Sequence, residues 1–421
     1  MAEQEYLTVA DALDMVLAGV DVLPGEHVPL LQALHRILAQ PVVAQDSLPP
    51  FANSAMDGYA VRADDVTGAS REAPATLRVV GDIAAGSDED IVLSAGSAAR
   101  IMTGAPLPEG ANAVIPVEDT SEPWRDAERQ LPQQIEIYRQ VGAGDYVRYP
   151  GEDIEAGTEV LPTGHLLRPQ EIGVLASLGV AQVPVIRRPR IGVLATGDEL
   201  IAVEEPLSPG KIRNSNGYAQ TAQVSSLGAK PVVLGVAGDS ERKVRDRLQA
   251  GLDAGVNLFV SSAGVSVGAY DVVKAVLERE GNVGFWRVRM RPGKPLAFGT
   301  YAGVPYLGLP GNPVSAMVSF ERFVRPAILK MAGHTVLERP RVAVRVTEAL
   351  TSDGRESYLR AHVARAEDGD YIATTTGSQG SHIMTSLVKA NALVIVPEGV
   401  TEVAAGQCLE ALMIDWPPTV F

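Results

Sequence analysis

The chain has 421 residues, of which 46% are hydrophobic and 21% are charged. This composition predicts a soluble globular protein with roughly two to four domains. The formal net charge is −15, which argues against nucleic acid or an anionic membrane as the main partner, because both require broad cationic surfaces. An anionic substrate would need a local cluster of Lys and Arg.

Cysteine and histidine usage argues against disulfides and against a zinc site. Cys408 is the single cysteine, and the six histidines lack HxH or HExxH spacing. The start, MAEQEYLTVADALD, is acidic and has no signal-like apolar core. No apolar run reaches the roughly 18 residues of a membrane span. We therefore expect a cytoplasmic protein that does not bind a membrane.

Residues 6–40 are predicted to form two helices. Thr8 is a suitable N-cap for the first, and VPLLQALHRILAQ, at 28–40, repeats the helical spacing of apolar residues. From about residue 46, short β-like runs separated by Gly, Pro and Asp predict a β-rich segment that ends near Arg148. Further on, Pro169 suits the first turn of a helix that runs through Leu178.

Strands and helices alternate from Arg190 onward. The strands are apolar runs at residues 190–197, 230–238, 257–264 and 304–311. Helices are expected at about 216–227, 240–254, 271–280 and 313–331. This order predicts a mostly parallel sheet covered on both faces. After about residue 334, alternating runs predict a small all-β domain.

Four turns are expected at one edge of the parallel sheet, where α/β proteins bind ligands. They are ATGDEL (195–200), AGDS (237–240), SSAGVSVG (261–268) and LPGNPVSAM (309–317). In the last, Pro310 and Pro313 fix the turn, which suits either a rigid strand–helix connection or a preorganised pocket wall.

The loop at 261–268 has the composition of an anion site. Its small residues let backbone N–H groups approach a phosphate, and the following helix begins with a partial positive charge. No GK[ST] follows, so the loop is not a Walker A motif. The alternative is an ordinary tight turn in which Asp271 stabilises the helix start.

Carboxylates gather at the same edge, at Asp198, Glu199, Asp239 and Asp271. Each one alone is better explained as a residue that caps or precedes its own helix. Beside a phosphate they would need Mg²⁺ or nearby cations. FWRVRMRPGKP supplies Arg287, Arg289 and Arg291, which would share one face of a strand, followed by Lys294. A solvated cationic face is the alternative.

Three stretches outside the α/β region contain predicted turns and acidic side chains. They are PPFANSAMDGYAVRADD, in which Asp57-Gly58 is typical of a hairpin turn, RIMTGAPLPEGANAVIPVED with Thr103-Gly104, and GEDI (151–154). None indicates a chemistry by itself.

Taken together, NSAMDGYAVR, RIMTGAPLPEGANAVIP, GEDI, ATGDEL, SSAGVSVGAYD, RPGKP and LPGNPVSA resemble the molybdopterin molybdenumtransferase family, which is the MoeA family and includes the gephyrin E domain. The resemblance covers nearly the whole chain, with the motifs in order. It implies a multidomain α/β plus β fold. The expected parts are an elongated helical domain (1–45 and 149–180), an inserted β-rich domain (46–148), a MogA-like doubly wound α/β domain (181–333) and a C-terminal β-barrel (334–421).

The resemblance also implies a reaction and its partners. Members insert molybdate into adenylylated molybdopterin with Mg²⁺, releasing AMP and forming the molybdenum cofactor. They are homodimers, with a cleft between the α/β domain of one subunit and the β-rich domain of the other. A MogA-like adenylyltransferase and molybdoenzyme acceptors are the further partners expected.

The family's site residues map onto this sequence motif by motif. The expected catalytic residues are Asp57, Asp153, Glu199, Asp239 and Asp271, of which Glu199, Asp239 and Asp271 would hold the metal. The expected cofactor-binding residues are Thr103, Ser262, Gly264, Ser266, Gly268, Arg287, Arg291, Lys294, Pro310, Asn312 and Pro313.

The sequence departs from the family's pattern at Ala263, where Gly is common, and at Arg287 and Arg291, where some members have Lys. Three alternatives to the molybdenum insertase stay open: a molybdopterin adenylyltransferase, a tungstate-specific insertase and a cofactor-binding scaffold.

Overall fold

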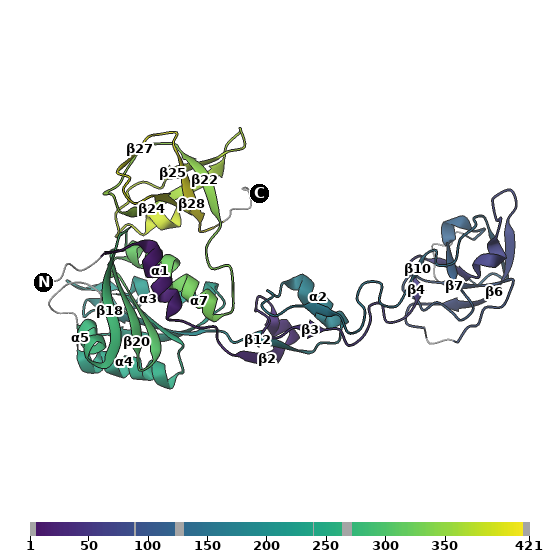
Figure 1. Ribbon diagram of the computed structural model, residues 1–421, viewed down its shortest axis with the longest axis horizontal. Coiled ribbons are helices and arrows are strands. Elements are labelled where there is room, and N and C mark those ends of the chain that lie inside the picture. Colours follow the sequence, from purple (N-terminus) through teal and green to yellow (C-terminus); the bar gives the residue numbers. More distant parts are fainter. Residues whose placement is uncertain (1–5, 88–89, 123–129, 239, 263–271, 416–421) are drawn as a thin grey trace. The chain divides into compact units, whose positions relative to one another are not determined.

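The computed structural model describes residues 6–87, 90–122, 130–238, 240–262 and 272–415 (Figure 1). The chain divides into two compact units. The smaller unit comprises Pro29–Leu34 and Gln40–Val183, and the larger unit comprises the segment up to Val28, His35–Ala39 and everything from Pro184 onward.

The smaller unit is built around a five-stranded sheet with the order β8-β5-β7-β6-β9. The strands are β5 (Gly58–Val61), β6 (Ala75–Ile83), β7 (Ser97–Ile101), β8 (Ala113–Pro116) and β9 (Gln134–Ile137). Two short pairs, β4 (Asn53–Ser54) with β10 (Val147–Arg148) and β3 (Val42–Val43) with β11 (Glu159–Leu161), and helix α2 (Pro169–Ser177) complete it. The predicted β-rich segment and the helix that begins at Pro169 are confirmed.

The second helix predicted within residues 6–40 is wrong. Strand β2 (Gly25–Pro29) and a 3₁₀ turn (Leu30–Ala33) occupy its first part, and His35 has a φ of 60°, which interrupts a helix. Backbone bonds instead reach the segment near residue 185, where Ile186 N donates to Ile37 O over 2.8 Å. The apolar spacing therefore reflects tertiary burial and not a helix.

The larger unit contains a seven-stranded sheet with the order β1-β18-β20-β21-β17-β13-β16. The strands are β1 (Tyr6–Leu7), β13 (Arg190–Thr196), β16 (Lys230–Ala237), β17 (Leu258–Ser262), β18 (Gly281–Val288), β20 (Pro295–Tyr301) and β21 (Val304–Leu309). β21, β17, β13 and β16 are parallel neighbours, as predicted. β20 runs antiparallel to both β18 and β21, a reversal that the alternating pattern did not indicate.

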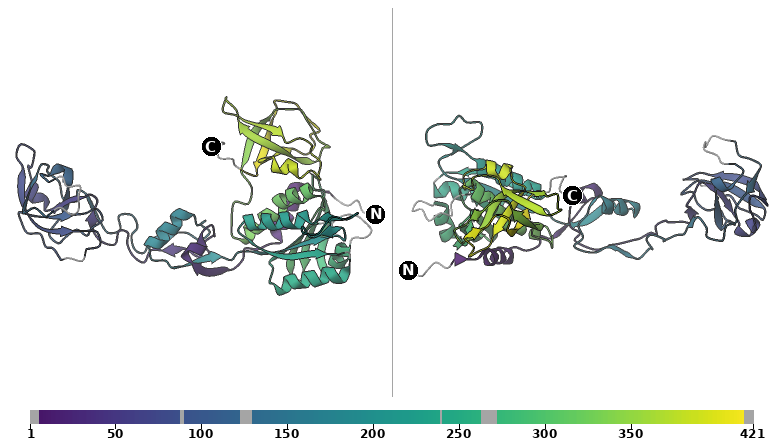
Figure 2. Two further views of the ribbon diagram at one scale, coloured as in Figure 1. Left: turned by 180° about the vertical axis from the view of Figure 1, so that it is seen from behind. Right: turned by 90° about the horizontal axis from the view of Figure 1, so that it is seen from above.

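Helices cover both faces of this sheet (Figures 1 and 2). They are α1 (Val9–Ala18), α3 (Ser215–Ser226), α4 (Glu241–Asp253), α5 (Val272–Glu280), α6 (Pro313–Ser319) and α7 (Arg325–Met331). One core contains side chains of α1, α3, α6 and α7, and a second core contains those of α4 and α5. Thr8 caps α1 as predicted, accepting from Asp11 N over 3.0 Å. A π-helical turn, Phe320–Val324, joins α6 to α7.

The C-terminal region forms a closed five-stranded barrel of β22 (Arg341–Val346), β24 (Glu356–Arg365), β25 (Tyr371–Thr375), β26 (Ala392–Val396) and β28 (Cys408–Met413). It closes because β24 pairs with both β25 and β26. Strand β19 (Met290–Arg291) leaves the α/β region to pair with β24, and Tyr358 joins the core of α1, α6 and α7. The expected fold class is therefore confirmed. Among the described residues, no helix has both the length and the apolar character that crossing a membrane requires.

Candidate functional site

The carboxyl ends of β21, β17, β13 and β16 lie side by side, because these strands are parallel neighbours. Leu309, Ser262, Thr196 and Ala237 are their last residues. The strand order thus confirms that the four predicted turns begin at one edge of the sheet. A pocket of about 1080 Å³ lies at this edge, within the larger unit.

Segments of the α/β region and of the barrel together line the pocket. Seven of the predicted residues are among its walls, namely Glu199, Ser262, Arg291, Lys294, Pro310, Asn312 and Pro313. The barrel contributes residues that the sequence did not single out, including Glu348, Arg355, Tyr358, Arg360, Gln379, Ser381 and His382.

The described walls of the pocket are cationic. They include five Lys and Arg side chains (Arg213, Arg291, Lys294, Arg355 and Arg360) and two carboxylates (Glu199 and Glu348). Glu348 is engaged by Thr375, whose N and Oγ1 donate to it over 2.9 and 2.6 Å. In a chain of net charge −15, this concentration of positive charge is what an anion site requires.

Arg360 is the most unusual of these cations because its side chain is buried, with 1% of the residue exposed. Its Nε donates to Ser386 Oγ over 3.1 Å and its Nη2 donates to the carbonyl of Gly380 over 3.3 Å. Both acceptors are neutral, and no ion pair joins Arg360 to a described carboxylate. Desolvation and the nearby charge of Arg291 lower the pKa of Arg360 to about 10. A buried guanidinium without a counterion is costly, so the site favours an anionic ligand.

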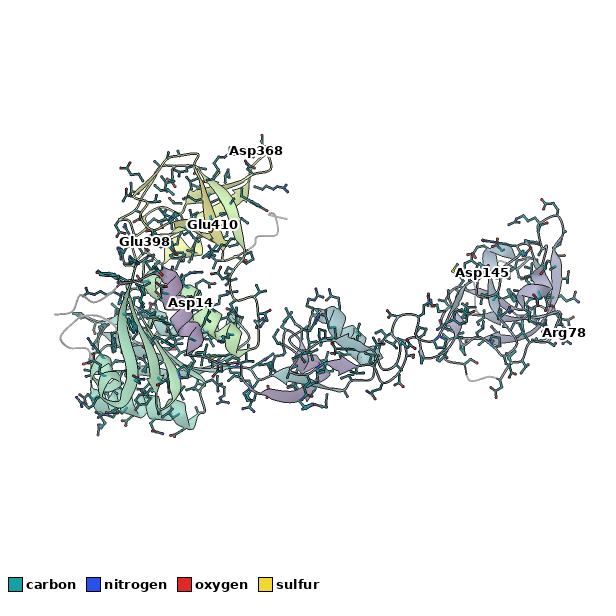
Figure 3. The ribbon with its side chains drawn as sticks, viewed as in Figure 1. Asp14, Arg78, Asp145, Asp368, Glu398 and Glu410 are labelled. Carbon is teal, nitrogen blue, oxygen red and sulfur yellow. The ribbon has the colours of Figure 1, made fainter. Side chains whose placement is uncertain are left out.

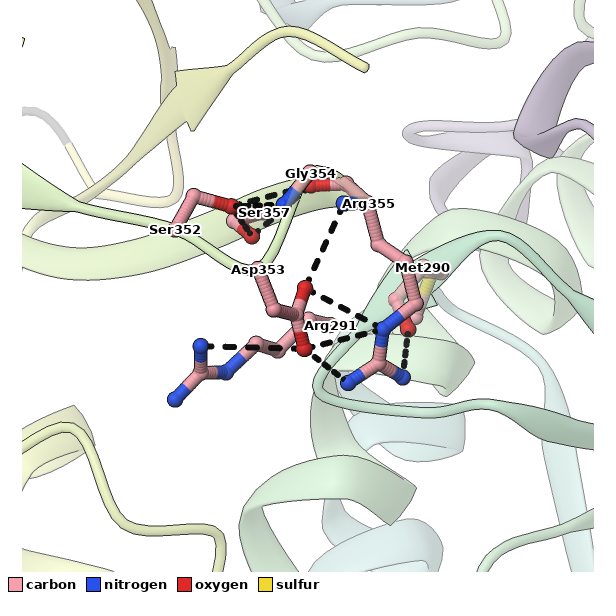
Figure 4. Close-up of polar contacts among 7 residues, drawn as sticks. All are labelled: Met290, Arg291, Ser352, Asp353, Gly354, Arg355 and Ser357. Carbon is pink, nitrogen blue, oxygen red and sulfur yellow. Dashed lines mark hydrogen bonds and ion pairs between the residues drawn. The ribbon is translucent and has the colours of Figure 1, made fainter. Parts of the chain in front are cut away.

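Arg291 and Arg355 share the carboxylate of Asp353 (Figure 4). Arg355 Nε lies 3.1 Å from Asp353 Oδ2, and Arg291 Nη1 lies 3.8 Å from the same oxygen. Arg355 Nη1 also donates to the carbonyl of Met290 over 3.1 Å, which fixes β19 against the barrel. The hydrogen bond from Arg355, with smaller help from Arg291, holds the pKa of Asp353 below its usual value.

The three alternating arginines do not form one cationic face on a single strand. The side chain of Arg287, on β18, lies near the ring of Tyr6. Arg289 pairs over 3.1 Å with Glu398, which is labelled in Figure 3. Of the three, Arg291 alone lines the pocket. The three arginines diverge because the chain leaves the sheet after Val288 and continues as β19, so each arginine meets a different neighbour.

Glu199 lies in a tight turn after β13. Gly197 has a φ of 137°, and a Cβ built there would lie 2.3 Å from Glu199 Oε2, so the turn needs glycine to leave room for the carboxylate. The carbonyl of Glu199 accepts from Ile212 N over 2.8 Å. This bond connects the turn to the pocket wall, which includes Ile212.

The expected metal site is not assembled by the described residues. Of its three predicted ligands, Asp239 and Asp271 lie outside the described part of the chain, as do Gly264, Ser266 and Gly268 of the cofactor loop. Within the described ranges, no group of three or more His, Cys, Asp or Glu side chains is placed to hold a metal ion. Glu199 alone does not define a Mg²⁺ site, which combines one or two carboxylates with substrate phosphates and water.

The turn between Pro310 and Pro313 is held from two sides. Asn216, at the start of α3, donates from Nδ2 to the carbonyl of Gly311 over 2.7 Å. Val314 N, in the first turn of α6, donates to the carbonyl of Ser381 in the barrel over 3.0 Å. These bonds support the predicted role of the turn as a rigid pocket wall.

Asp57, Thr103 and Asp153 belong to the smaller unit and are exposed there. Asp57 Oδ1 accepts from both N and Oγ1 of Thr103, each over 2.8 Å. Asp57 does not occupy a two-residue hairpin, because β4 pairs with β10 while β5 pairs with β7 and β8. The pairing of Asp57 with Thr103 places two predicted site residues in direct contact.

The barrel residues of the site were missed because their burial depends on tertiary contacts. Arg360 stands in an alternating strand, ESYLRAHVAR, where nothing local distinguishes it from a surface arginine. The stretch GSQGSH (377–382) did carry a signal, since its small and polar residues resemble those of the other site loops. It supplies Gln379, Gly380, Ser381 and His382 to the pocket.

Three family models match consecutive parts of the chain. They describe the MoeA N-terminal region (domain I and II) at residues 7–179, a probable molybdopterin binding domain at 192–330 and the MoeA C-terminal region (domain IV) at 343–414. The order of these matches agrees with the β-rich smaller unit, the α/β region and the barrel. The fold together with these matches defines a multidomain protein of the MoeA type.

Individual relatives match over almost the whole chain. Molybdopterin molybdenumtransferase 2 of Mycobacterium tuberculosis is 41% identical over 91% of this chain and 93% of its own, and the molybdopterin molybdenumtransferase of a Nostoc species is 39% identical over 92% and 88%. A crystal structure of the molybdopterin biosynthesis MoeA protein from Pyrococcus horikoshii matches with a TM-score of 0.81 and 30% identity, covering 98% of this chain and 100% of its own. The chain belongs to the MoeA family of transferases.

Proposed function

We propose that the chain inserts molybdate into adenylylated molybdopterin, with release of AMP and formation of the molybdenum cofactor. The observation that carries this proposal is the buried guanidinium of Arg360, which lines the pocket with Lys294 and Arg291 and has no ion pair with a described carboxylate. A small dianion such as molybdate supplies the missing negative charge. The relatives are named molybdopterin molybdenumtransferases, which indicates molybdenum as the metal transferred and molybdopterin as its acceptor.

The residues of the pocket divide the work between binding and positioning. Arg360 and Lys294 offset the charge of the oxyanion, and the rigid wall from Pro310 to Pro313 keeps the organic substrate in register with it. The two dithiolene thiols of molybdopterin replace one oxygen of molybdate, and their protons leave with that oxygen as water. Hydrolysis of the pyrophosphate bond then consumes one water molecule and releases AMP.

Mg²⁺ belongs to the proposal, with Glu199, Asp239 and Asp271 as its ligands. Support comes from the position of Glu199 in the pocket wall and from the acidic character of the two turns that hold the other carboxylates. The ion would neutralise the pyrophosphate when bound.

The proposal also includes the expected assembly and partners. The chain acts as a homodimer in the cytoplasm, receives its substrate from an adenylyltransferase of the MogA type and passes its product to molybdoenzymes. The pairing of Asp57 with Thr103 supports a contribution of the smaller unit to the reaction, since both are predicted site residues and both are exposed.

Reconstitution of an apo-molybdoenzyme tests the proposal. The chain, adenylylated molybdopterin, Mg²⁺ and molybdate are incubated with the apoenzyme, and tungstate replaces molybdate in a parallel reaction. We expect enzyme activity with molybdate. Reconstitution with tungstate but not with molybdate would assign a tungstate-specific insertase. Consumption of ATP by the chain in the presence of unmodified molybdopterin, without any oxyanion, would assign an adenylyltransferase.

A further inference from the structure

The N-terminal segment adds an edge strand to the sheet, beside the segment that carries Arg291 and Lys294 of the pocket wall. β1 runs parallel to β18, with Tyr6 opposite Arg287 and Leu7 opposite Val288. Arg289 N donates to the carbonyl of Leu7 over 2.8 Å. Tyr6 is therefore held next to the point where the chain leaves the sheet to form β19.

Lys294 stands where the chain returns to the sheet. Val288 N donates to its carbonyl over 2.7 Å, and Arg287 pairs with Pro295 in the next register position. The ammonium group of Lys294 lies 5.1 Å from the centre of the Tyr6 ring, and the guanidinium of Arg287 lies 5.9 Å from it. Both cations are thus within the range of a cation–π interaction with one aromatic ring.

The Tyr6 ring thus contacts two side chains of like charge. Neither Lys294 nor Arg287 forms an ion pair with a residue that the structure describes. The side chain of Lys294, with a smaller contribution from Arg287, lowers the pKa of Tyr6 below its ordinary value. A lysine on a flexible four-carbon chain would otherwise sample many positions in solvent.

We propose that Tyr6 is a positioning residue that restrains the side chain of Lys294, a residue of the pocket wall, and so sets the affinity of the pocket for an oxyanion. This inference rests on the proposed function of the pocket as a molybdate site. It assigns a role to a residue that lies far from the site motifs in sequence and does not itself line the pocket.

The role of Tyr6 predicts a change in affinity more than in turnover. Loss of a cation–π interaction at an exposed site corresponds to about a two- to fivefold change in a binding constant. We expect Tyr6→Leu to weaken molybdate binding by about that factor. Tyr6→Phe keeps the ring and loses only the hydroxyl group, so its effect should be smaller. The molybdate KM for AMP release should rise in parallel while kcat changes less.

A double-mutant cycle on the full-length protein tests the proposal, with molybdate binding measured by equilibrium dialysis. If Tyr6 acts through Lys294, then Tyr6→Leu weakens binding in the wild-type background and has no further effect in the Lys294→Met background. Tyr138→Leu is the matched control, because Arg71 lies 5.3 Å above the Tyr138 ring in the smaller unit. It removes the same kind of contact without a connection to Lys294 and should leave binding unchanged.

The outcomes distinguish the role of Tyr6 from the function of the pocket. Additive effects of Tyr6→Leu and Lys294→Met, or an equal loss in Tyr138→Leu, would overturn the role of Tyr6 and leave the proposed function standing. Failure of the wild-type protein to bind molybdate would overturn the proposed function and this inference with it. An unchanged affinity in Tyr6→Leu, with Lys294→Met impaired, would overturn the inference alone.

Discussion

Asp57 and Thr103 are joined by two hydrogen bonds, since the backbone N and the Oγ1 of Thr103 each lie 2.8 Å from Asp57 Oδ1. The two residues are 46 positions apart and lie in two different loops of the smaller unit. Both are exposed, so the pair adds less than about 1 kcal/mol to stability. Its effect is to hold one carboxylate oxygen of Asp57 in a fixed orientation.

Thr103→Val tests whether this orientation serves the reaction. The substitution removes the hydroxyl donor and keeps the backbone bond, so we expect Tm to fall by less than about 2 °C. AMP release should fall severalfold because Asp57 gains rotational freedom. Thr103→Ser, which keeps the hydroxyl, should retain most of the activity. A large loss of Tm without loss of AMP release would show that the pair serves only the fold.

Arg360→Met should weaken molybdate binding at least about tenfold, because it removes the buried positive charge of the pocket. Arg360→Lys should recover part of the binding, since it restores charge but not the planar fork of donors. The control is Arg345→Met, because Arg345 is in the same barrel and pairs on the surface with Asp368. Equilibrium dialysis with molybdate provides the measurement. Equal affinities in Arg360→Met and Arg345→Met would contradict an oxyanion role for Arg360.

Gly197→Ala should displace the Glu199 carboxylate without altering Glu199 itself. The new Cβ would lie 2.3 Å from Oε2, and the φ of 137° is unfavourable for alanine. The nearest atoms belong to the end of a flexible side chain, so the carboxylate moves and the fold persists. We expect AMP release to fall about as far as in Glu199→Gln.

Gly210→Ala is the matched control for Gly197→Ala. Gly210 also has a positive φ, of 79°, but a Cβ there would meet nothing within 4 Å. It therefore carries backbone strain without displacing a carboxylate, and AMP release should stay near the wild-type rate. If both alanine variants lose the same activity, strain in the backbone and not the position of Glu199 is responsible.

Glu171 should make helix α2 sensitive to acid. Its carboxylate accepts from Arg168 N over 2.8 Å in a capping box, and hydrogen bonds from the Arg168 side chain, and then from His165, hold its pKa well below the usual range despite burial. A depressed pKa in the folded state means that the stabilisation is complete above the unfolded pKa of about 4.3 and declines as the pH falls below that value.

Hydrogen exchange of the α2 amides measures this effect. At pH 7, Glu171→Gln should speed exchange in α2 by an amount equivalent to about 1 kcal/mol, the usual contribution of a helix cap. The difference between the variant and the wild type should shrink as the pH falls below about 4. A difference that grows with acidity would contradict the assigned direction of the pKa shift.

The sequence predicted the α/β region well because its strands are continuous apolar runs whose order along the chain fixes which ends meet. Residues 28–40 were predicted wrongly, since their apolar spacing is produced by packing near Ile186 and not by a helical period. Arg360 was not foreseen because its burial arises only when β24 closes the barrel against the segment that carries Ser386. Long-range closure of this kind leaves no local pattern.

The most direct test of molybdenum insertion is AMP release from adenylylated molybdopterin in the presence of Mg²⁺, with and without molybdate. We expect AMP release to depend on molybdate, and the Arg360→Met variant to need a higher molybdate concentration to reach half of its maximal rate. AMP release at the same rate without molybdate, or none at all while the adenylylated substrate stays bound, would contradict this expectation.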